Sequence, residues 1–306
     1  MIDNLRFYLM DKDLFDYQIE KSGVIDLTSQ YNRHTGEIEE YPKKGKYYNL
    51  SVDIYQYRSY VTGSFHKLFN NIVHGENHNY NDFRYCEFLQ ILEWAQDEIY
   101  VLPDKTSITN LEFGLNIEIP MDADIFLDYM LLMYDFKIAT RNEVTSSKNF
   151  REFKKTDYSL KVYNKSKQNM KKTNVVRFEV KITKSRLLHK MGIYSLEDLK
   201  SRNVMIKLFE LLLVQFDKLL IIDMKGMVKV PDKACAGLIK DFTNPNYWSN
   251  LKNSVSSKVF RRVVRDCRRY VEENELDSAQ FAIRKLLQDK FEQMMNCYGE
   301  AIQKAA

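Results

Sequence analysis

The 306-residue sequence predicts an α+β fold: a mostly antiparallel sheet with packed helices, followed by an all-helical C-terminal region. Short runs that alternate apolar and polar residues, typical of half-buried strands, recur up to about residue 190. Segments with apolar residues at helical spacing lie between these runs. Beyond residue 190 only the helical pattern continues. These three observations carry the prediction.

The composition indicates a globular chain with a sizeable buried core. Hydrophobic residues make up 44% of the sequence and aromatic residues 13%. No apolar run approaches the ~18 residues that span a bilayer, and the first residues lack the pattern of a signal peptide. We therefore expect a cytoplasmic protein with no membrane contact. The four cysteines are scattered, so we expect reduced thiols rather than disulfides or a zinc site.

The N-terminal part of the chain has the pattern of a β-rich segment. The clearest strand signal starts at Tyr47, but its alternation shifts by one residue between Ile54 and Tyr55. A bulge there, or tyrosines on the more solvated face, would explain the shift. The predicted strands are Asn4–Leu9, Gly23–Thr28, Thr35–Glu40 and Tyr47–His66.

Helices and strands alternate in the next part of the sequence. Apolar residues recur at helical spacing from Asp82 to Tyr100. Ser107–Pro120 alternates like a strand and places Glu112 on its polar face. Asp122–Lys137 has the pattern of an amphipathic helix, and the lysine-rich segment Arg141–Thr156 that of a loop.

Two strands then concentrate polar side chains on one side of the predicted sheet. They run from Leu160 to Asn164 and from Asn174 to Thr183, joined by a basic, polar turn. Because strand side chains alternate in direction, aliphatic residues of both strands share the buried face. The opposite face carries Lys161, Tyr163, Val175, Arg177, Glu179 and Lys181.

The chain after Thr183 is predicted to be helical. A long helix is predicted from Asn203 to Ile222. A further helix starts at Pro231 and ends near Asn244. The tail from Tyr247 onward is helical as well. We place a domain boundary near residue 228, between an α+β domain of residues 1–228 and a helical accessory domain of residues 229–306.

Positive charge is concentrated in two segments although the net charge is only +4. Ser146–Lys190 holds fourteen Lys and Arg against three Asp and Glu, and Lys252–Tyr270 holds seven against one. The rest of the chain is therefore net acidic. Such segregation favours a polyanionic partner, the alternative being two solvated basic faces. The arginines after Val259 suit duplex phosphate, or else a basic surface helix or an oligomer contact.

The polar strand face has the residue types needed for phosphodiester chemistry. A phenol with its usual pKa near ~10 is a weak nucleophile until a lysine or a metal stabilises the phenolate. Lys165 and Lys167 follow Tyr163 closely enough to do this, or to hold a phosphate. Two carboxylates and a histidine, namely Glu112, Glu179 and His66, would suit Mg²⁺ or Mn²⁺.

The segment around these strands also resembles a known family. VYNKSKQ, followed by VVRFEVKITKSRLLHKMGI, is similar to the central motif of filamentous-phage replication initiators, the gene II protein family. It resembles the plasmid initiators of the Rep_trans family more loosely. Tyr163–Lys165 and Arg177–Glu179 stand in the order of the family's YxK and RFE elements. Asn110–Leu111–Glu112 corresponds to the family's R-I-D strand, with glutamate for aspartate and no arginine.

The resemblance implies a rolling-circle replication initiator of a phage or plasmid. Tyr163 would attack one strand of origin DNA, leaving a 5′-phosphotyrosine and a free 3′-OH for the host replication machinery. The DNA would be single-stranded at the nick and duplex nearby. Glu112, Glu179 and His66 would hold Mg²⁺ or Mn²⁺. The charge of the phosphate would be stabilised by the side chains of Lys165, Lys167 and Arg177.

Two other functions remain open. A DNA-binding replication protein without nuclease activity is favoured by the missing histidine pair, since Asn116–Ile117–Glu118 occupies the comparable strand. A relaxase of a mobilisable element would share the chemistry and differ only in its DNA.

His74 and His78 have the i, i+4 spacing of metal ligands, but their polar segment favours a solvated loop. No nucleotide-binding glycine pattern is present in the sequence.

Overall fold

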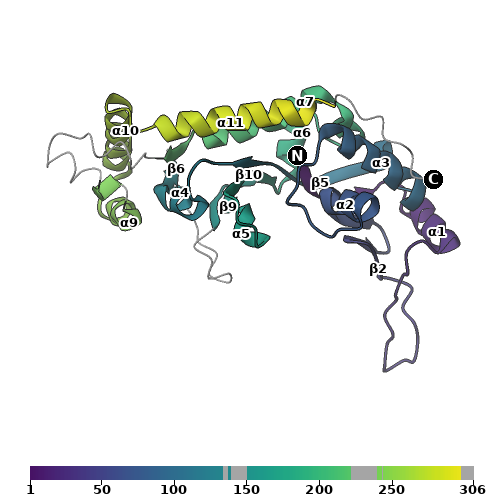
Figure 1. Ribbon diagram of the computed structural model, residues 1–306. Coiled ribbons are helices and arrows are strands. Elements are labelled where there is room, and N and C mark those ends of the chain that lie inside the picture. The colour runs from purple at the N-terminus through teal and green to yellow at the C-terminus, as the bar shows by residue number, and fades with distance from the viewer. Residues whose placement is uncertain (134–136, 139–149, 222–239, 243, 298–306) are drawn as a thin grey trace. The chain divides into compact units, whose positions relative to one another are not determined.

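A computed structural model describes residues 1–133, 137–138, 150–221, 240–242 and 244–297 of the chain (Figure 1). It contains an eight-stranded antiparallel sheet with packed helices, and helices make up the described C-terminal region. The predicted α+β fold class is therefore confirmed. None of the helices in these ranges combines the length and the apolar character that a membrane crossing requires.

The large sheet has the strand order β2-β3-β4-β1-β5-β10-β9-β8. Sequence neighbours such as β2–β3, β3–β4 and β8–β9 pair as antiparallel hairpins, as short connections allow. A second sheet of short strands has the order β11-β6-β7. The bounds are β1 Ile2–Leu9, β2 Lys43–Tyr47, β3 Leu50–Ile54, β4 Ser59–Ser64, β5 Thr106–Glu118, β6 Met130–Met133, β7 Lys137–Ile138, β8 Phe150–Lys154, β9 Tyr158–Asn164, β10 Val175–Ile182 and β11 Leu219–Ile221.

The chain forms two compact units that interleave in sequence. The first unit comprises Met1–Gly114, Val180–Glu210 and the chain from Phe291 onward. The second comprises Leu115–Glu179 and Leu211–Lys290. The predicted boundary near residue 228 lies outside the described residues, so the division into 1–228 and 229–306 stays a prediction.

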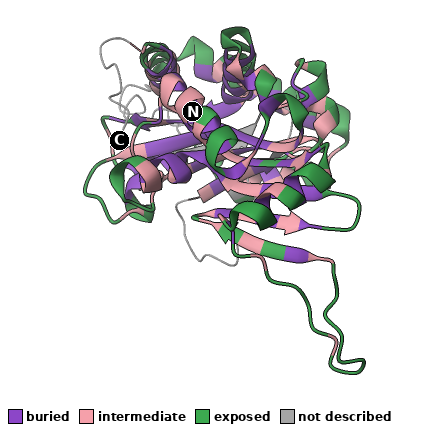
Figure 2. Cartoon of the chain, turned by 90° about the vertical axis from the view of Figure 1, so that its right-hand side faces the viewer, coloured by how far each residue is buried: buried purple, intermediate pink, exposed green. Residues whose placement is uncertain are grey.

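The first unit packs helices on one face of its strands. Phe7 of β1 contacts Phe65 of α2 with ring centroids 6.2 Å apart, and Phe65 in turn lies 6.3 Å from Phe88 of α3. Residues that alternate with Phe7 point to the opposite face, where Arg6 is exposed and Tyr8 half-buried. In Figure 2 the central strands are largely buried or half-buried, whereas the helices expose their outer sides. The helices that begin in this unit are α1 Lys12–Ser22, α2 Phe65–His74, α3 Tyr85–Ile99, α6 Ser185–Lys190 and α7 Arg202–Phe216, with 3₁₀ turns η1 Pro103–Lys105 and η3 Glu197–Lys200.

Two predicted strands are absent from the first unit. Gly23–Thr28 and Thr35–Glu40 form no strand and contribute only isolated bridges, Thr28 to Lys44 and Tyr31 to Ile38. A single bridge leaves most backbone N–H and C=O groups without a hydrogen bond to another strand. The residues from 23 to 40 also have little apolar surface to bury. It therefore forms a connection between α1 and β2 instead of a sheet element.

The rest of the predicted β-rich start contains two helices that the sequence reasoning missed. Asp11 caps α1 by accepting a hydrogen bond from the Leu14 amide at 3.1 Å. Ser64 caps α2 in the same way through the Lys67 amide. The predicted strand from Tyr47 to His66 is a hairpin, β3 and β4, and the phase shift after Ile54 is its loop rather than a bulge.

The second unit has two apolar clusters. Phe178 of β10 contacts Phe126 at 6.2 Å and Phe216 at 5.4 Å. A second cluster surrounds Trp248, whose indole donates to the Phe242 carbonyl at 2.7 Å. The helices of this unit are α4 Ala123–Tyr129, α5 Lys165–Gln168, α9 Pro245–Ser254, α10 Ser257–Glu273 and α11 Ser278–Met295, the last of which ends in the first unit.

Three boundaries in the second unit differ from the prediction. The helix expected over Asp122–Lys137 ends at Tyr129 and β6 follows. The loop expected over Arg141–Thr156 contains β8 in its described part. The helix expected to reach Ile222 ends at Phe216, because Leu219–Ile221 pairs with β6. The helix expected from Pro231 falls almost entirely outside the described residues.

Candidate functional site

The alternation predicted for β9 and β10 is confirmed, and it places polar side chains on one face. Leu160 and Val162 of β9 are fully buried, whereas Lys161 and Tyr163 are half-buried. On β10, Phe178 is buried on the apolar face. Arg177 and Glu179 on the polar face of β10 are buried as well, which the sequence alone did not indicate.

Glu179 lies at the centre of this polar face and is only 2% exposed. Its Oε1 accepts a hydrogen bond from Lys161 Nζ at 2.9 Å, and its Oε2 accepts one from Arg177 Nε at 2.9 Å. Burying a carboxylate is costly unless it is paired and hydrogen-bonded, and these two cations meet both needs. The carboxylate is therefore part of a compact ion-pair network.

Arg177 extends the network to β5. Its guanidinium donates to the side-chain oxygen of Asn116 at 3.0 Å, and its side chain is 3% exposed. The planar guanidinium can serve two acceptors at once, which a lysine cannot do with the same geometry. Arg177, Glu179, Lys161 and Asn116 thus fix three strands of the second unit to one another.

Tyr163 lies on the same strand as Lys161, two residues further along. Its ring lies 5.9 Å from that of Phe150, its register partner on β8. The Nζ atom of Lys165 lies 5.6 Å from the centre of the Tyr163 ring. The phenol is half-buried. The tyrosine is thus held by a neighbouring ring on one strand and a lysine on the turn that follows.

The turn after β9 forms the short helix α5. Asn164 caps it by accepting from the Lys167 amide at 2.9 Å. Lys165 is 2% exposed and donates to Gln168 at 3.1 Å, which is unusual burial for a lysine. Lys167 is exposed and forms an ion pair with Asp124 at 3.0 Å. The two lysines therefore differ: Lys165 lies beneath the turn and Lys167 lies on its surface.

Glu112 and His66 belong to the first unit and have partners there. Glu112 forms an ion pair with Lys181 at 2.9 Å. His66 lies in the first turn of α2, 2% exposed, stacked on Phe83 at 4.7 Å and hydrogen-bonded to Asn81 at 2.8 Å. Tyr163, Arg177 and Glu179 are described within the second unit.

The donor set gives little support to the predicted Mg²⁺ or Mn²⁺. Divalent cations of this kind take oxygen ligands, and Mg²⁺ is usually held by one or two carboxylates together with substrate phosphates. Each of the two predicted carboxylates is instead matched to lysine or arginine. Within the described residues no three His, Cys, Asp or Glu side chains are grouped as ligands would be. As arranged, protein cations hold these carboxylates, and the metal stays a prediction.

Sequence reasoning missed three contributors to the site: Lys161 and Asn116 as members of the Glu179 network, and Asp124 as the partner of Lys167. The alternation of β9 and β5 already placed Lys161 and Asn116 on the polar face, so that signal could have found them. Asp124 comes from α4, more than forty residues away in sequence, and no local pattern indicates it.

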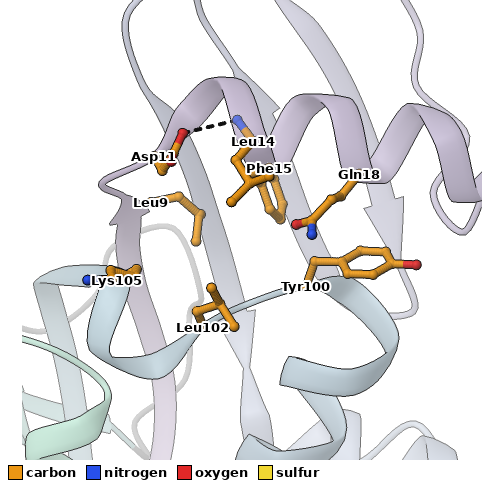
Figure 3. Close-up of a pocket in the computed structure, with 8 residues that line it drawn as sticks. All are labelled: Leu9, Asp11, Leu14, Phe15, Gln18, Tyr100, Leu102 and Lys105. Carbon is orange, nitrogen blue, oxygen red and sulfur yellow. Dashed lines mark hydrogen bonds between the residues drawn. The ribbon is translucent and has the colours of Figure 1, made fainter.

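Among its described residues, the first unit has at least two concave features. One is a pocket of about 100 Å³ lined mainly by apolar side chains of β1, α1 and the segment before β5 (Figure 3). It is far smaller than the ~300 Å³ at which small-molecule sites begin. The other is an open groove of about 640 Å³ lined by tyrosines and arginines.

The sequence matches no protein-family model and no curated protein. A solved structure of a rolling circle replication initiator protein from Geobacillus stearothermophilus is similar, with 11% sequence identity and a TM-score of 0.38. The match covers 82% of this chain and 93% of the other. A TM-score this low does not assign a function to this chain.

Proposed function

We propose that the protein is a rolling-circle replication initiator that nicks one strand of origin DNA through Tyr163. The observation that carries the proposal is the pairing of a half-buried strand tyrosine with Lys165, inside the most basic segment of the chain. A cation close to a phenol favours the phenolate, the form that attacks phosphorus. The motif order from Tyr163 to Ile193 supports the same assignment.

The reaction is a transesterification. The Tyr163 oxygen attacks the phosphorus of one phosphodiester, the bond from phosphorus to the 3′ oxygen breaks, and the phenolic proton is lost as the 3′ oxygen gains one. The products are a 5′-phosphotyrosine and a free 3′-OH. Lys165 stabilises the phenolate, and Lys167, exposed on the same turn, reaches a backbone phosphate. Arg177 acts with Glu179 to hold the strands that position the tyrosine.

The proposal includes a divalent metal ion and the host replication machinery. A requirement for Mg²⁺ or Mn²⁺ is tested by nicking assays with each ion and with a chelator, and no step above depends on it. The free 3′-OH would serve the host replication machinery of a bacterial cell. A phage and a plasmid origin share this chemistry, and a relaxase of a mobilisable element would differ only in its DNA.

The non-catalytic alternative, an origin-binding replication protein, is favoured by one observation. Glu179 is paired with two cations rather than presented to a metal. This function would need the same basic surface but no nucleophile. It predicts salt-sensitive DNA binding and no covalent adduct under any divalent ion.

The test is a nicking assay on supercoiled DNA that carries the protein's own replicon. Tyr163→Phe should reduce nicking below detection while DNA affinity stays within about twofold, because only the attacking oxygen is lost. Tyr158→Phe is the matched control on the same strand. Burial raises the pKa of Tyr158, with the Asp157 charge adding to the effect, and its hydroxyl donates to Gln215 at 2.9 Å.

The Tyr158 variant should therefore nick at the normal rate. A 5′-end label retained on the protein after denaturation would identify the adduct, and mass spectrometry would place it on Tyr163. Normal nicking by Tyr163→Phe would refute the assignment. The absence of nicking and of an adduct with every metal would support the non-catalytic alternative.

A further inference from the structure

The first unit has a groove whose lining is unusual in composition. Four of its eight lining residues are tyrosines and two are arginines, and the groove has a volume of about 640 Å³. Tyr57, in the loop between β3 and β4, is 82% exposed, and Tyr55 in the same loop is 42% exposed. The full lining is Arg6, Tyr41, Pro42, Tyr55, Gln56, Tyr57, Arg58 and Tyr60.

Register explains how these rings come together. Tyr8 of β1 lies directly opposite Tyr60 of β4, and their rings are 6.1 Å apart. Tyr60 also lies 6.1 Å from Tyr55. The three tyrosines therefore form a continuous set on the face of the strands opposite Phe7, which packs against the helices. This face is a platform rather than part of the core.

The charge of the groove is positive. Arg6 lies 4.8 Å from the centre of the Tyr60 ring, and Arg58 lies 5.3 Å from that of Tyr8. No carboxylate belongs to the lining. Along β1 to β4, all of which the structure describes, the register places one acid on this face, Asp53, and Lys44 lies directly opposite it. The lining thus presents two arginines and no carboxylate to a bound molecule.

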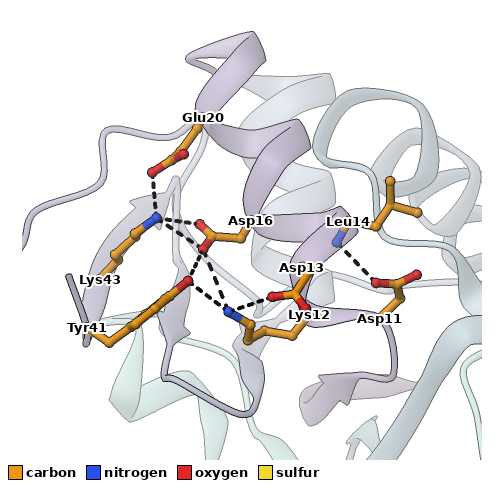
Figure 4. A network of polar contacts seen from close by, with 8 residues as sticks. All are labelled: Asp11, Lys12, Asp13, Leu14, Asp16, Glu20, Tyr41 and Lys43. Carbon is orange, nitrogen blue, oxygen red and sulfur yellow. Dashed lines mark hydrogen bonds and ion pairs between the residues drawn. The ribbon is translucent and has the colours of Figure 1, made fainter.

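A buried network holds one wall of the groove in place (Figure 4). The Tyr41 hydroxyl donates to Asp16 at 3.0 Å and accepts from Lys12 at 2.8 Å. Lys43 donates to Asp16 at 3.0 Å and lies within ion-pair distance of Glu20 at 2.5 Å. Burial alone would lower the pKa of Lys43, but its bonds to the two carboxylates outweigh burial and raise it.

We propose that this groove binds the unpaired bases of single-stranded DNA, at a site distinct from Tyr163. Bases stack on aromatic side chains while cations at the rim bind phosphates, and every base offers a face for stacking. Bases inside a duplex are already stacked on one another and cannot insert between tyrosines. The site goes beyond the nicking proposal and does not rest on it, because its residues belong to a different unit.

A proline-rich peptide is the other occupant that a tyrosine-lined groove could take. The two arginines and the absence of a lining carboxylate favour a phosphodiester backbone instead. Single-stranded RNA shares the stacking chemistry, and only the 2′-hydroxyl distinguishes it. We assign the groove to DNA, and the affinity for an oligouridylate distinguishes the two.

The test measures fluorescence anisotropy of a labelled oligothymidylate of about 16 nucleotides with the full chain. Tyr57→Ala should weaken binding by about 5-fold to 150-fold, the range for loss of one stacked base. Tyr17→Ala is the matched control. Tyr17 lies on α1 in the same unit, outside the groove, and is 60% exposed.

The control should bind as the wild type does, and a duplex of the same length should be insensitive to Tyr57→Ala. Ultraviolet cross-linking of the oligothymidylate should map to groove tyrosines. Unchanged affinity of Tyr57→Ala, an oligouridylate that binds more tightly, or displacement by a proline-rich peptide would each overturn the proposal.

The outcome is separable from that of the nicking assay. Tyr163→Phe should retain single-stranded binding in the groove. Tyr57→Ala should still form the covalent adduct when DNA is saturating. A protein that fails to nick but loses oligothymidylate affinity on Tyr57→Ala would refute the nickase proposal alone.

Discussion

Glu179 illustrates what the residue scale contributes to this protein. The carboxylate is almost completely buried, and it is neutralised by Arg177 of its own strand and Lys161 of the neighbouring strand β9. Such a network stabilises weakly in total, since desolvation offsets much of the attraction, but it makes the removal of any single member expensive. The same network fixes the strand that carries Tyr163, so its integrity matters for the geometry of the proposed nucleophile.

We predict that Glu179→Gln lowers the free energy of unfolding by about 3–5 kcal/mol, because the buried Arg177 and the half-buried Lys161 lose their counter-charge. Chemical denaturation measures the loss. Glu112→Gln is the matched control: its partner Lys181 has a side chain that is 36% exposed, so solvent compensates more of the change. A loss for Glu179→Gln no larger than that of the control would contradict the network's role.

At the scale of single elements, α10 combines a core stripe with a basic surface. Phe260, Val264, Cys267 and Val271 are buried at helical spacing, and burial raises the pKa of the Cys267 thiol to about 12. The arginines occupy the exposed sides of the helix. Some are compensated within the helix: Arg268 pairs with Glu272, and Arg269 with Asp266. The buried stripe packs the helix against the core, and the arginine side chains therefore lie in solvent.

Arg262 and Arg265 have no ion pair among the described residues. We predict that replacing both by alanine reduces the slope of log affinity for duplex DNA against log salt by about 2, since each phosphate contact contributes about 0.9. The melting temperature should stay unchanged, because both side chains are exposed. The double variant Arg268→Ala and Arg269→Ala should have a smaller effect. An unaltered slope would indicate a basic surface helix or an oligomer contact.

At the scale of the whole molecule, the two compact units interleave in sequence. Phe291, close to the end of α11, stacks on Phe209 with ring centroids 4.1 Å apart and also contacts Phe113. Cys297 accepts a hydrogen bond from the Cys86 amide at 3.1 Å. The C-terminal helices therefore contribute to the core of the first unit as well as to the second.

A chain that ends at residue 228 tests this arrangement against the predicted boundary. We predict that it fails to unfold cooperatively, because it lacks the Phe291 ring and the α11 helix. Calorimetry of that chain shows whether it has a cooperative unfolding transition. Phe291→Ala in the full chain is the comparison: it should keep the transition and lower the free energy of unfolding by about 3–5 kcal/mol. A cooperative transition in residues 1–228 would instead support an independent α+β domain with a separate helical accessory domain.

The sequence by itself determined the fold class, the faces of β9 and β10 and the basic character of the segment around Tyr163. These follow from alternation, helical spacing and local charge, which depend on residues close together in the chain. It misjudged the first part of the chain, where two predicted strands did not form and the capped helices α1 and α2 were missed, because cap geometry and packing overrode an ambiguous local pattern.

Only the tertiary structure decided which residues meet. It buried Glu179 between Lys161 and Arg177, paired Glu112 with Lys181 and enclosed His66 against Phe83. It also brought Arg6 and Tyr41 to the run Tyr55–Tyr60, and these residues together line the tyrosine groove. The physical reason is that burial and partner choice depend on residues distant in the chain, whereas periodicity reports only the direction in which each side chain points.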